Sequence, residues 1–286
     1  GLLTLLASMN LHSCNFTGSI PAEMMTLPLL KLLYLYENSF TGTIPEIVAL
    51  SNLEKLNLRK NKLTGPIPNG IGFCTLLDEL EARENQLTSS LPSEITMLSN
   101  LKILSARENQ ITGTIPADIG RMTALELLQL RQNQLTGTIP FLGSLTSLTD
   151  LNIRDNKMTG DIPNEIYSLT ALNSLNLGND IARGNAFHGT FPSDFSFTTL
   201  ENLHLHNIHL SGTISSNIGR LTNLSVLYLQ GNALTGTVPP VIHDMETLTK
   251  LFLYNNNLTG GFVCPTQIEE CLVSCENLAD YACRAL

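Results

Sequence analysis

The sequence has no tryptophan, few aromatic residues and little charge, and these shortages narrow its class. Charged residues make up 14% of its 286 residues, against about 25% in an ordinary soluble domain. Its 16 lysines and arginines are outnumbered by 25 acidic residues, which gives a net charge of −9 and argues against general binding of nucleic acid or anionic membranes. The most apolar stretch, residues 27–36, contains Pro28 and Lys31 and is too short to span a membrane.

Leucine is abundant instead, with 53 copies, and it recurs in a fixed pattern. Each string Leu-x-Leu-x-x-Asn-x-Leu is separated from the next by 23 or 24 residues, with one spacing of 29. The asparagines of these strings form one column, in which Cys14 and Ile208 occupy two places: Asn38, Asn61, Asn85, Asn109, Asn133, Asn156, Asn185, Asn232 and Asn256. A string of this kind with a period of 20 to 29 residues is typical of leucine-rich repeats.

The residues after the asparagine column carry a more specific resemblance. Leu63-Thr64-Gly65-Pro66-Ile67-Pro68 and its counterparts from Ile111 and Leu135 resemble the plant-type leucine-rich repeat of receptor-kinase ectodomains and polygalacturonase-inhibiting proteins. The resemblance implies an α/β solenoid, a right-handed superhelix with one long parallel sheet on its concave face and short helical or 3-10 returns. It also implies an extracellular recognition surface and no enzymatic reaction.

The period predicts a solenoid of about eleven repeats over residues 1–262 and a cysteine-rich C-terminal cap over residues 263–286. The first eight residues contain no basic signal region and run directly into the repeat, so we expect further residues upstream in the mature protein. The spacing of 29 predicts an insertion near residues 178–184, which is either a functional loop or a tolerated surface insertion. Ile208, beside it, is expected to weaken the asparagine ladder.

The six cysteines fall into two groups. Cys14 and Cys74 stand in repeat positions and are predicted to be buried, unreactive thiols. The cap cysteines, which are expected to form disulfides in one of three possible pairings, are Cys264, Cys271, Cys275 and Cys283. Their spacing fits a zinc site poorly. Disulfides, together with glycosylation motifs at Asn15, Asn223 and Asn257, favour an extracellular or cell-surface glycoprotein on the secretory route.

Alternation along each strand predicts which side chains face outward from the sheet. The position after the second strand leucine holds Tyr36 and then five consecutive arginines: Arg59, Arg83, Arg107, Arg131 and Arg154. Carboxylates occupy the neighbouring columns, so two interpretations stay open. The arginines either form a self-satisfied ion-pair lattice or form a recognition strip for the acidic groups of an extended partner.

Towards the C-terminal end the same face changes to ring-bearing residues. We predict partner contacts there and at the aromatic residues near the first strands, at Tyr34, Tyr36, His204, His206, Tyr228, Phe252 and Tyr254. Exposed aromatic residues of this kind are common anchors of protein interfaces, although they also stabilise sheets by packing on one another. His204 and His206 share a strand face, but spacing supplies no further ligand, so neither a metal nor another cofactor is predicted.

These observations predict a non-enzymatic extracellular module that binds a protein or peptide through its concave face. The chain contains no catalytic signature, no membrane span and no feature of a nucleic-acid binder. One alternative is a structural or scaffold subunit of a matrix or larger assembly. Others are binding of an acidic polysaccharide, or of ice through the threonine columns of the return side.

Overall fold

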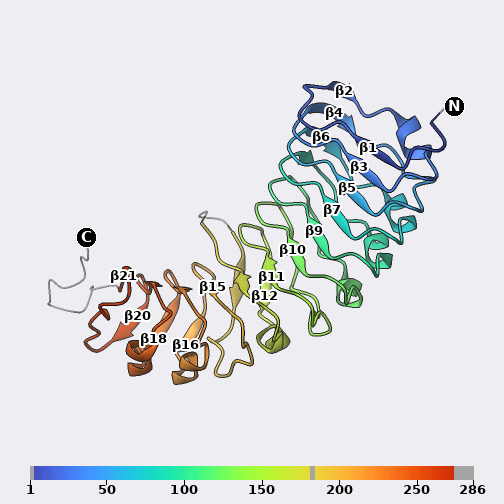
Figure 1. The fold of residues 1–286 in the computed structure, drawn as a ribbon. Coiled ribbons are helices and arrows are strands. Elements are labelled where there is room, and N and C mark those ends of the chain that lie inside the picture. The colour runs from blue at the N-terminus through green and yellow to red at the C-terminus, as the bar shows by residue number, and fades with distance from the viewer. Residues whose placement is uncertain (1–2, 181–183, 274–286) are drawn as a thin grey trace. The chain divides into compact units, whose positions relative to one another are not determined.

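A computed structural model describes residues 3–180 and 184–273, and these fold into two compact units that divide between Leu148 and Thr149. Each unit is described by itself. Both consist of short coils that repeat in parallel (Figure 1), and each coil begins with a strand of three residues. Among the described residues, no helix is long and apolar enough to cross a bilayer.

In the described residues of the first unit, the main sheet has six strands that pair in parallel and in sequence order: β1 (Ser8–Asn10), β3 (Leu32–Tyr34), β5 (Lys55–Asn57), β7 (Glu79–Glu81), β9 (Ile103–Ser105) and β10 (Leu127–Gln129). The register places the central residue of each strand beside the central residue of the next, so Leu80 pairs with Leu104 and Leu104 with Leu128. These leucines are at most 1% exposed. Alternation therefore sends one leucine column inward and leaves its two flanking columns facing outward.

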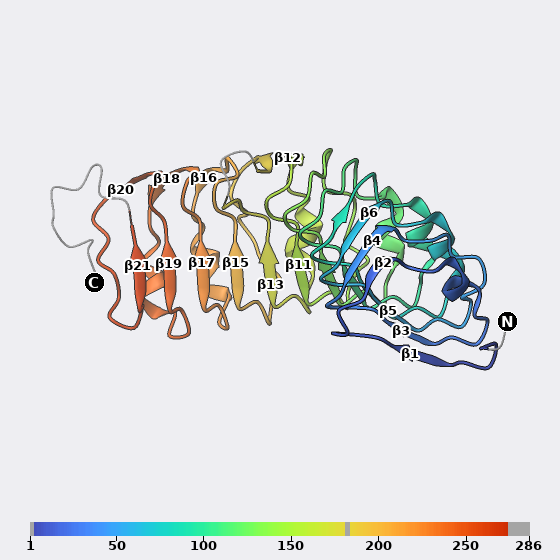
Figure 2. The ribbon, with the colours of Figure 1, turned by 90° about the horizontal axis from the view of Figure 1, so that it is seen from above.

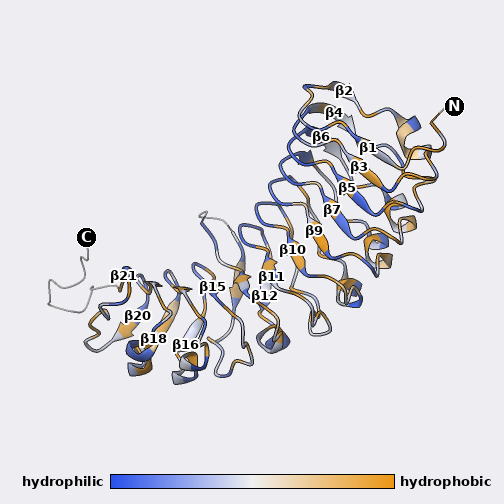
Figure 3. Ribbon diagram, in the orientation of Figure 1, coloured by the Kyte–Doolittle hydropathy of each residue, from blue (hydrophilic) through white to orange (hydrophobic). Residues whose placement is uncertain are grey.

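The second unit repeats this arrangement with β11 (Asp150–Asn152), β13 (Ser174–Asn176), β15 (Asn202–His204), β17 (Val226–Tyr228), β19 (Lys250–Phe252) and β21 (Glu270–Leu272). Seen from above, strands β15, β17, β19 and β21 lie side by side (Figure 2). Apolar and polar residues alternate along the ribbon of each coil (Figure 3). The repeat period thus places the central leucine of most of these strands in the core of its own unit.

The return half of most coils contains a second short strand, a turn of 3-10 helix, or both. The second strands are β2 (Thr17–Ser19), β4 (Ser39–Thr43), β6 (Lys62–Gly65), β8 (Gln86–Leu87), β12 (Thr159–Asp161), β14 (Ala186–His188), β16 (Ser211–Thr213), β18 (Ala233–Thr237) and β20 (Asn257–Thr259). The 3-10 helices are η1 (Ala22–Thr26), η2 (Asn69–Phe73), η3 (Ser93–Met97), η4 (Ala117–Arg121), η5 (Asn164–Ser168), η6 (Ser216–Arg220) and η7 (Pro240–Asp244). The α/β solenoid with 3-10 returns that the sequence predicts is confirmed.

The glycine of the Thr-Gly motif has a backbone reason. Gly65 has a φ of +71°, and a Cβ there would overlap the methyl group of Thr43 in the preceding coil. Only glycine adopts this conformation readily while allowing such a close approach.

Asparagine side chains tie successive coils together. The amide of Asn109 donates to the carbonyl oxygens of Ala82 (3.0 Å) and Ala106 (3.1 Å), while its oxygen accepts the N–H of Leu87 (2.9 Å). Asn61 and Asn133 repeat this pattern. Each amide thereby satisfies backbone groups where the chain leaves the strand.

At the break in this ladder the structure supplies a substitute. Ile208 is fully buried, and Asn179 and Asn207 exchange two hydrogen bonds of 2.7 Å between side-chain amide and backbone carbonyl. Asn179 also bonds both the N–H and the carbonyl oxygen of Asn185 (2.7 Å each), which closes the base of the predicted insertion. Residues 181–183, in its middle, lie outside the described residues.

Of the two isolated cysteines, one fulfils the prediction and one does not. Cys74 is buried, and burial raises the pKa of its thiol to about 12. The prediction for Cys14 is wrong, because its side chain is exposed and its sulfur contacts the carbonyl oxygen of His12 at 3.2 Å. Cys14 belongs to the first described coil, so no earlier described coil packs over it.

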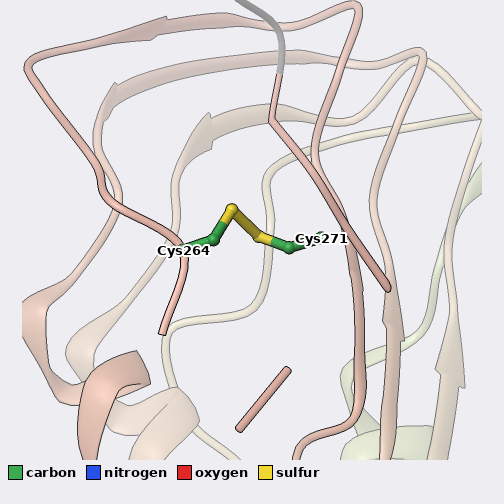
Figure 4. The surroundings of a disulfide bond; sticks show 2 residues. All are labelled: Cys264 and Cys271. Carbon is green, nitrogen blue, oxygen red and sulfur yellow. A yellow bond between two sulfur atoms is a disulfide. The ribbon is translucent and has the colours of Figure 1, made fainter. Parts of the chain in front are cut away.

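The C-terminal segment is described as far as Val273. Cys264 and Cys271 form a disulfide (Figure 4), and Cys271 lies at the centre of β21, which pairs with β19. This is one of the pairings that the sequence allows. Cys275 and Cys283 lie outside the described residues, and a cap over residues 263–286 stays a prediction.

Candidate binding face of the parallel sheet

The outward-facing side chains of the odd-numbered strands and β10, with the residues that follow each strand, are called the sheet face here. In the first unit it carries the arginine column. Arg59 lies over the ring of Tyr36, with its guanidinium carbon 4.7 Å from the ring centre, and Tyr36 stacks in turn on His12 at 4.6 Å. Tyr34 contacts Tyr36 edge to face at 6.3 Å. The column thus begins with an ordered group of aromatic rings.

Carboxylates connect the arginines that follow. Glu84 pairs with Arg83 of its own coil and with Arg107 of the next coil at 3.2 Å. Glu108 likewise pairs with Arg107 and, at 2.6 Å, with Arg131. Each of these carboxylates is therefore shared by two guanidinium groups.

A backbone feature that sequence reasoning missed puts the shared carboxylates in place. The residue after each arginine is left-handed, with φ values of +56° at Glu84 and Glu108 and +55° at Gln132. This conformation is uncommon outside glycine and asparagine. The recurrence of Arg-Glu-Asn or Arg-Gln-Asn at the end of the strand is the sequence signal that accompanies it.

The side chains of Arg83, Arg107 and Arg131 are only 18–20% exposed. Burial is the main cause that lowers the pKa of Arg107, and the positive charges of Arg131 and Arg83 act in the same direction. The geometry matches the ion-pair lattice more closely than a row of free cations. Arg131 differs from Arg107 because one of its partners is the neutral amide of Gln132.

In the second unit the column continues with Arg154, which pairs with Asp155 at 3.6 Å and with Asp180. Asp180 also accepts from Nε2 of His206 at 3.0 Å. Gly178 takes the place of the next arginine, and a Cβ there would overlap the His206 ring. The missing side chain at Gly178 therefore makes room for the histidine of the next coil.

Ring-bearing residues form a stack on this part of the sheet face. His204, Tyr228 and Phe252 stand opposite one another on β15, β17 and β19. The ring centres of His204 and Tyr228 are 4.5 Å apart, as are those of Tyr228 and Phe252, with interplanar angles of 25° and 8°. Tyr254 lies beside Phe252 at 6.3 Å. The stack confirms that these rings pack across strands; a role in binding stays a prediction.

His206 corrects the expectation of a uniformly exposed group, because it is 3% exposed. Burial lowers the pKa of His206 to about 4, and Arg154 acts in the same direction while Asp155 opposes it. Burial, His206 and Arg154 lower the pKa of His204 to about 4 as well. Both rings are neutral at pH 7. In the described residues, no three His, Cys, Asp or Glu side chains are grouped to hold a metal.

The neutral histidines make stability depend on pH. An unfolded histidine binds a proton near pH 6.5, whereas folded His206 does so only near pH 4, so the unfolded state holds more protons between these values and stability falls as pH decreases. Because of His206, we expect the free energy of unfolding, measured with urea, to be about 2 kcal/mol lower at pH 5 than at pH 7. His206→Gln should remove that loss, and the exposed neighbour His209→Gln should keep it. Equal pH profiles for wild type and His206→Gln would contradict the assignment.

The predicted glycosylation sites lie at the surface. Asn15, Asn223 and Asn257 are exposed, although the amide of Asn223 donates to the carbonyl oxygen of Thr198 at 2.8 Å. Their occupancy stays a prediction. On the return side, the predicted threonine columns are exposed at Thr41, Thr43, Thr235, Thr237 and Thr259.

Comparison with known proteins agrees with the fold and the motif. The Leucine Rich Repeat family model matches residues 52–74, 100–122, 147–169 and 223–245. Pollen receptor-like kinase 2 of Arabidopsis thaliana is 44% identical over 64 residues, which is 22% of this chain and 10% of that protein. A second Arabidopsis receptor-like kinase with leucine-rich repeats is 38% identical over 69 residues, 24% of this chain and 7% of its own length.

Solved structures match over nearly the whole chain. The plant peptide hormone receptor RGFR1, in complex with RGF2, has a TM-score of 0.85 and 31% identity, covering 95% of this chain and 48% of that one. PEPR1 with AtPEP1 gives 0.84 and 29%, covering 93% and 38%. A plant ice-binding protein gives 0.71 and 27%, covering 89% and 80%. The chain therefore spans less than half of each of these two receptor chains.

These matches confirm the resemblance that the repeat motif carries. The chain is a leucine-rich-repeat protein of the plant type.

Proposed function

We propose that this chain is a non-enzymatic, extracellular or cell-surface recognition module that binds a protein or peptide through its sheet face. The observation that carries the proposal is the likeness, at 29–31% identity, to plant receptor structures described in complex with peptides. The disulfide and the exposed glycosylation motifs support the extracellular location. The repeats hold the side chains of the sheet face in place before binding, so little conformational entropy is lost on association.

The partner contacts are proposed at the arginine column and at the ring-bearing residues of both units. The ordered stack of His204, Tyr228 and Phe252 supports the second group more strongly, because aromatic side chains on a rigid scaffold are efficient anchors. The arginines contribute orientation and selectivity, since their charges are largely paired within the chain.

The test is affinity capture from extracellular fluid of the source with matched variants. Val226→Arg places a bulky cation on the sheet face, and Ala233→Arg places the same group on the exposed return strand of the same coil. Leu127→Arg and Thr136→Arg form the corresponding pair in the first unit. We expect at least tenfold less partner retained by a sheet-face variant, and wild-type retention by both return-side variants. Loss with the return-side variants alone would place the partner on the other face.

A second candidate function, ice binding, is favoured by the likeness to a plant ice-binding protein and by the exposed threonine columns. The hydroxyls of Thr235 and Thr259 donate to the carbonyl oxygens of Gly212 (3.2 Å) and Gly236 (3.3 Å), which fixes their rotamers. If this function holds, the wild type inhibits ice recrystallisation and the double variant Thr213→Lys/Thr237→Lys does not. A wild type without inhibition rules it out.

A further inference from the structure

The sheet face of the second unit contains several buried polar atoms without hydrogen-bond partners. Among them are the Oδ1 atom of Asn176, Nε2 of His204, Nδ1 of His206 and Oε1 of Gln230. Asn176 and Gln230 are each 7% exposed, and His206 is 3% exposed. Native proteins satisfy most buried polar atoms, so a cluster of exceptions calls for an explanation.

Three adjacent strands bring these atoms together. Asn176 is opposite His204 on β13 and β15, and His204 is opposite Tyr228 on β15 and β17. Gln230 follows Tyr228 by two residues and therefore continues the same outward alternation, as His206 does after His204. The cluster lies beside the ring stack and not in the leucine core.

The unpaired atoms are chiefly acceptors. In both Asn176 and Gln230, the buried atom without a hydrogen-bond partner is the amide oxygen. His206 is neutral and its Nε2 faces the Asp180 carboxylate at 3.0 Å, so Nε2 carries the proton and Nδ1 is left as an acceptor. What this surface needs from a partner is therefore N–H or O–H donors.

Charge and ring geometry narrow the partner further. Arg154, whose charge acts on both His204 and His206, is paired with Asp155 and Asp180, so little of its positive charge is left for an acidic group. The rings of Tyr228 and Phe252 are stacked against each other, so their edges, not their inner faces, are available. Stacked edges suit an apolar side chain better than a sugar ring, which packs on an open aromatic face.

We propose that Asn176 and Gln230 accept backbone N–H groups of an extended, uncharged peptide segment, while an apolar side chain of that segment packs on the edges of Tyr228 and Phe252. The inference rests on the proposed function for the choice of face and of a peptide partner. It adds the position of the anchor and its chemistry. Rotation about the terminal torsion of either amide, which is soft, turns the oxygen towards the peptide.

The probe is a phage-displayed library of random linear nonapeptides, selected on the whole chain. Enriched peptides are synthesised, and their affinities for wild type and Gln230→Met are measured by calorimetry. Methionine keeps the length of the side chain but removes the acceptor, and folding should be unaffected because the amide oxygen has no partner to lose. Gln110→Met, at an exposed glutamine of the first unit, is the matched control.

We expect enriched peptides without a preference for acidic residues, bound at least tenfold more weakly by Gln230→Met and equally by Gln110→Met. Methylating one backbone nitrogen of the peptide should weaken binding to wild type at least tenfold but have little effect on binding to Gln230→Met. Such coupling identifies a hydrogen bond, which a purely structural role of Gln230 does not produce.

Peptides that lose affinity with Leu127→Arg but not with Gln230→Met would overturn this inference and leave recognition by the sheet face standing. An absence of coupling, or of any enriched peptide, overturns it as well. The proposed function is judged separately, by capture of a natural partner with the sheet-face and return-side variants.

Discussion

Replacing Leu104 with aspartate is expected to unfold the repeats of the first unit. Leu104 is fully buried at the centre of β9, between Leu80 and Leu128. A carboxylate there has no counter-ion, and burying it without a partner costs at least about 4 kcal/mol. Because each repeat depends on its neighbours, the loss should spread along the unit, as measured by urea unfolding followed by circular dichroism.

The control is the preceding residue. Ile103→Asp carries the same charge at an outward-facing, partly exposed position of the same strand. It should cost no more than about 1 kcal/mol, since a surface charge beside Glu79 is mostly screened. Similar losses for the two variants would show that the register of the strands is wrong.

The second large effect is expected at the asparagine ladder. Asn133, 8% exposed, donates to the carbonyl oxygens of Ala106 (2.9 Å) and Leu130 (3.1 Å) and accepts the N–H of Ile111 (2.9 Å). Asn133→Ala leaves these buried groups without partners, and each such group costs about 1–3 kcal/mol. A destabilisation of at least about 3 kcal/mol is therefore expected in urea unfolding.

Asn69, the exposed first residue of η2, provides the comparison for this substitution. Asn69→Ala should change the free energy of unfolding by less than about 0.5 kcal/mol, as is usual for a surface site. An Asn133→Ala protein as stable as Asn69→Ala would mean that the ladder contributes little to holding the coils together.

Much of the fold was predictable because each position of the repeat occurs many times in the sequence. One leucine position, misjudged in a single repeat, is corrected by its equivalents in the others, and the asparagine column follows from the same alignment. Burial of Leu80, Leu104 and Leu128 and the contacts of Asn109 agree with that alignment. Departures from the repeat were harder to predict, as the exposed thiol of Cys14 and the Asn179–Asn207 pair beside Ile208 show.

The position of the candidate site was predictable from the sequence, but the ion pairs between its arginines and carboxylates were not. Alternation correctly placed the arginines on the outward face, but it cannot tell whether a carboxylate in the next column points at a guanidinium. That depends on the left-handed conformation of Glu84 and Glu108, which the residue type does not favour. The burial of His206 depends on the missing side chain of Gly178 one coil away, a relation that a column-by-column alignment of outward positions does not contain.

Because the arginines are held in an ion-pair lattice, a charge-reversal variant in the arginine column would not test binding alone. Arg107→Glu would place a third carboxylate between Glu84 and Glu108, which Arg107 now bridges. Like charges held this close repel one another, so stability falls along with any effect on a partner. Substitutions outside the lattice, such as Val226→Arg, separate binding from folding more cleanly.

The sequence contains no tryptophan, so a single introduced tryptophan gives one unambiguous signal. Such reporters allow the most direct measurement of where a partner binds. Single 5-fluorotryptophan reporters are placed on the sheet face by Tyr34→Trp and Tyr228→Trp, and on the exposed return strands by Thr43→Trp and Thr237→Trp. On addition of the captured partner, the fluorine resonance of at least one sheet-face reporter should shift while both return-side resonances stay in place. Shifts confined to the return-side reporters would contradict recognition through the sheet face.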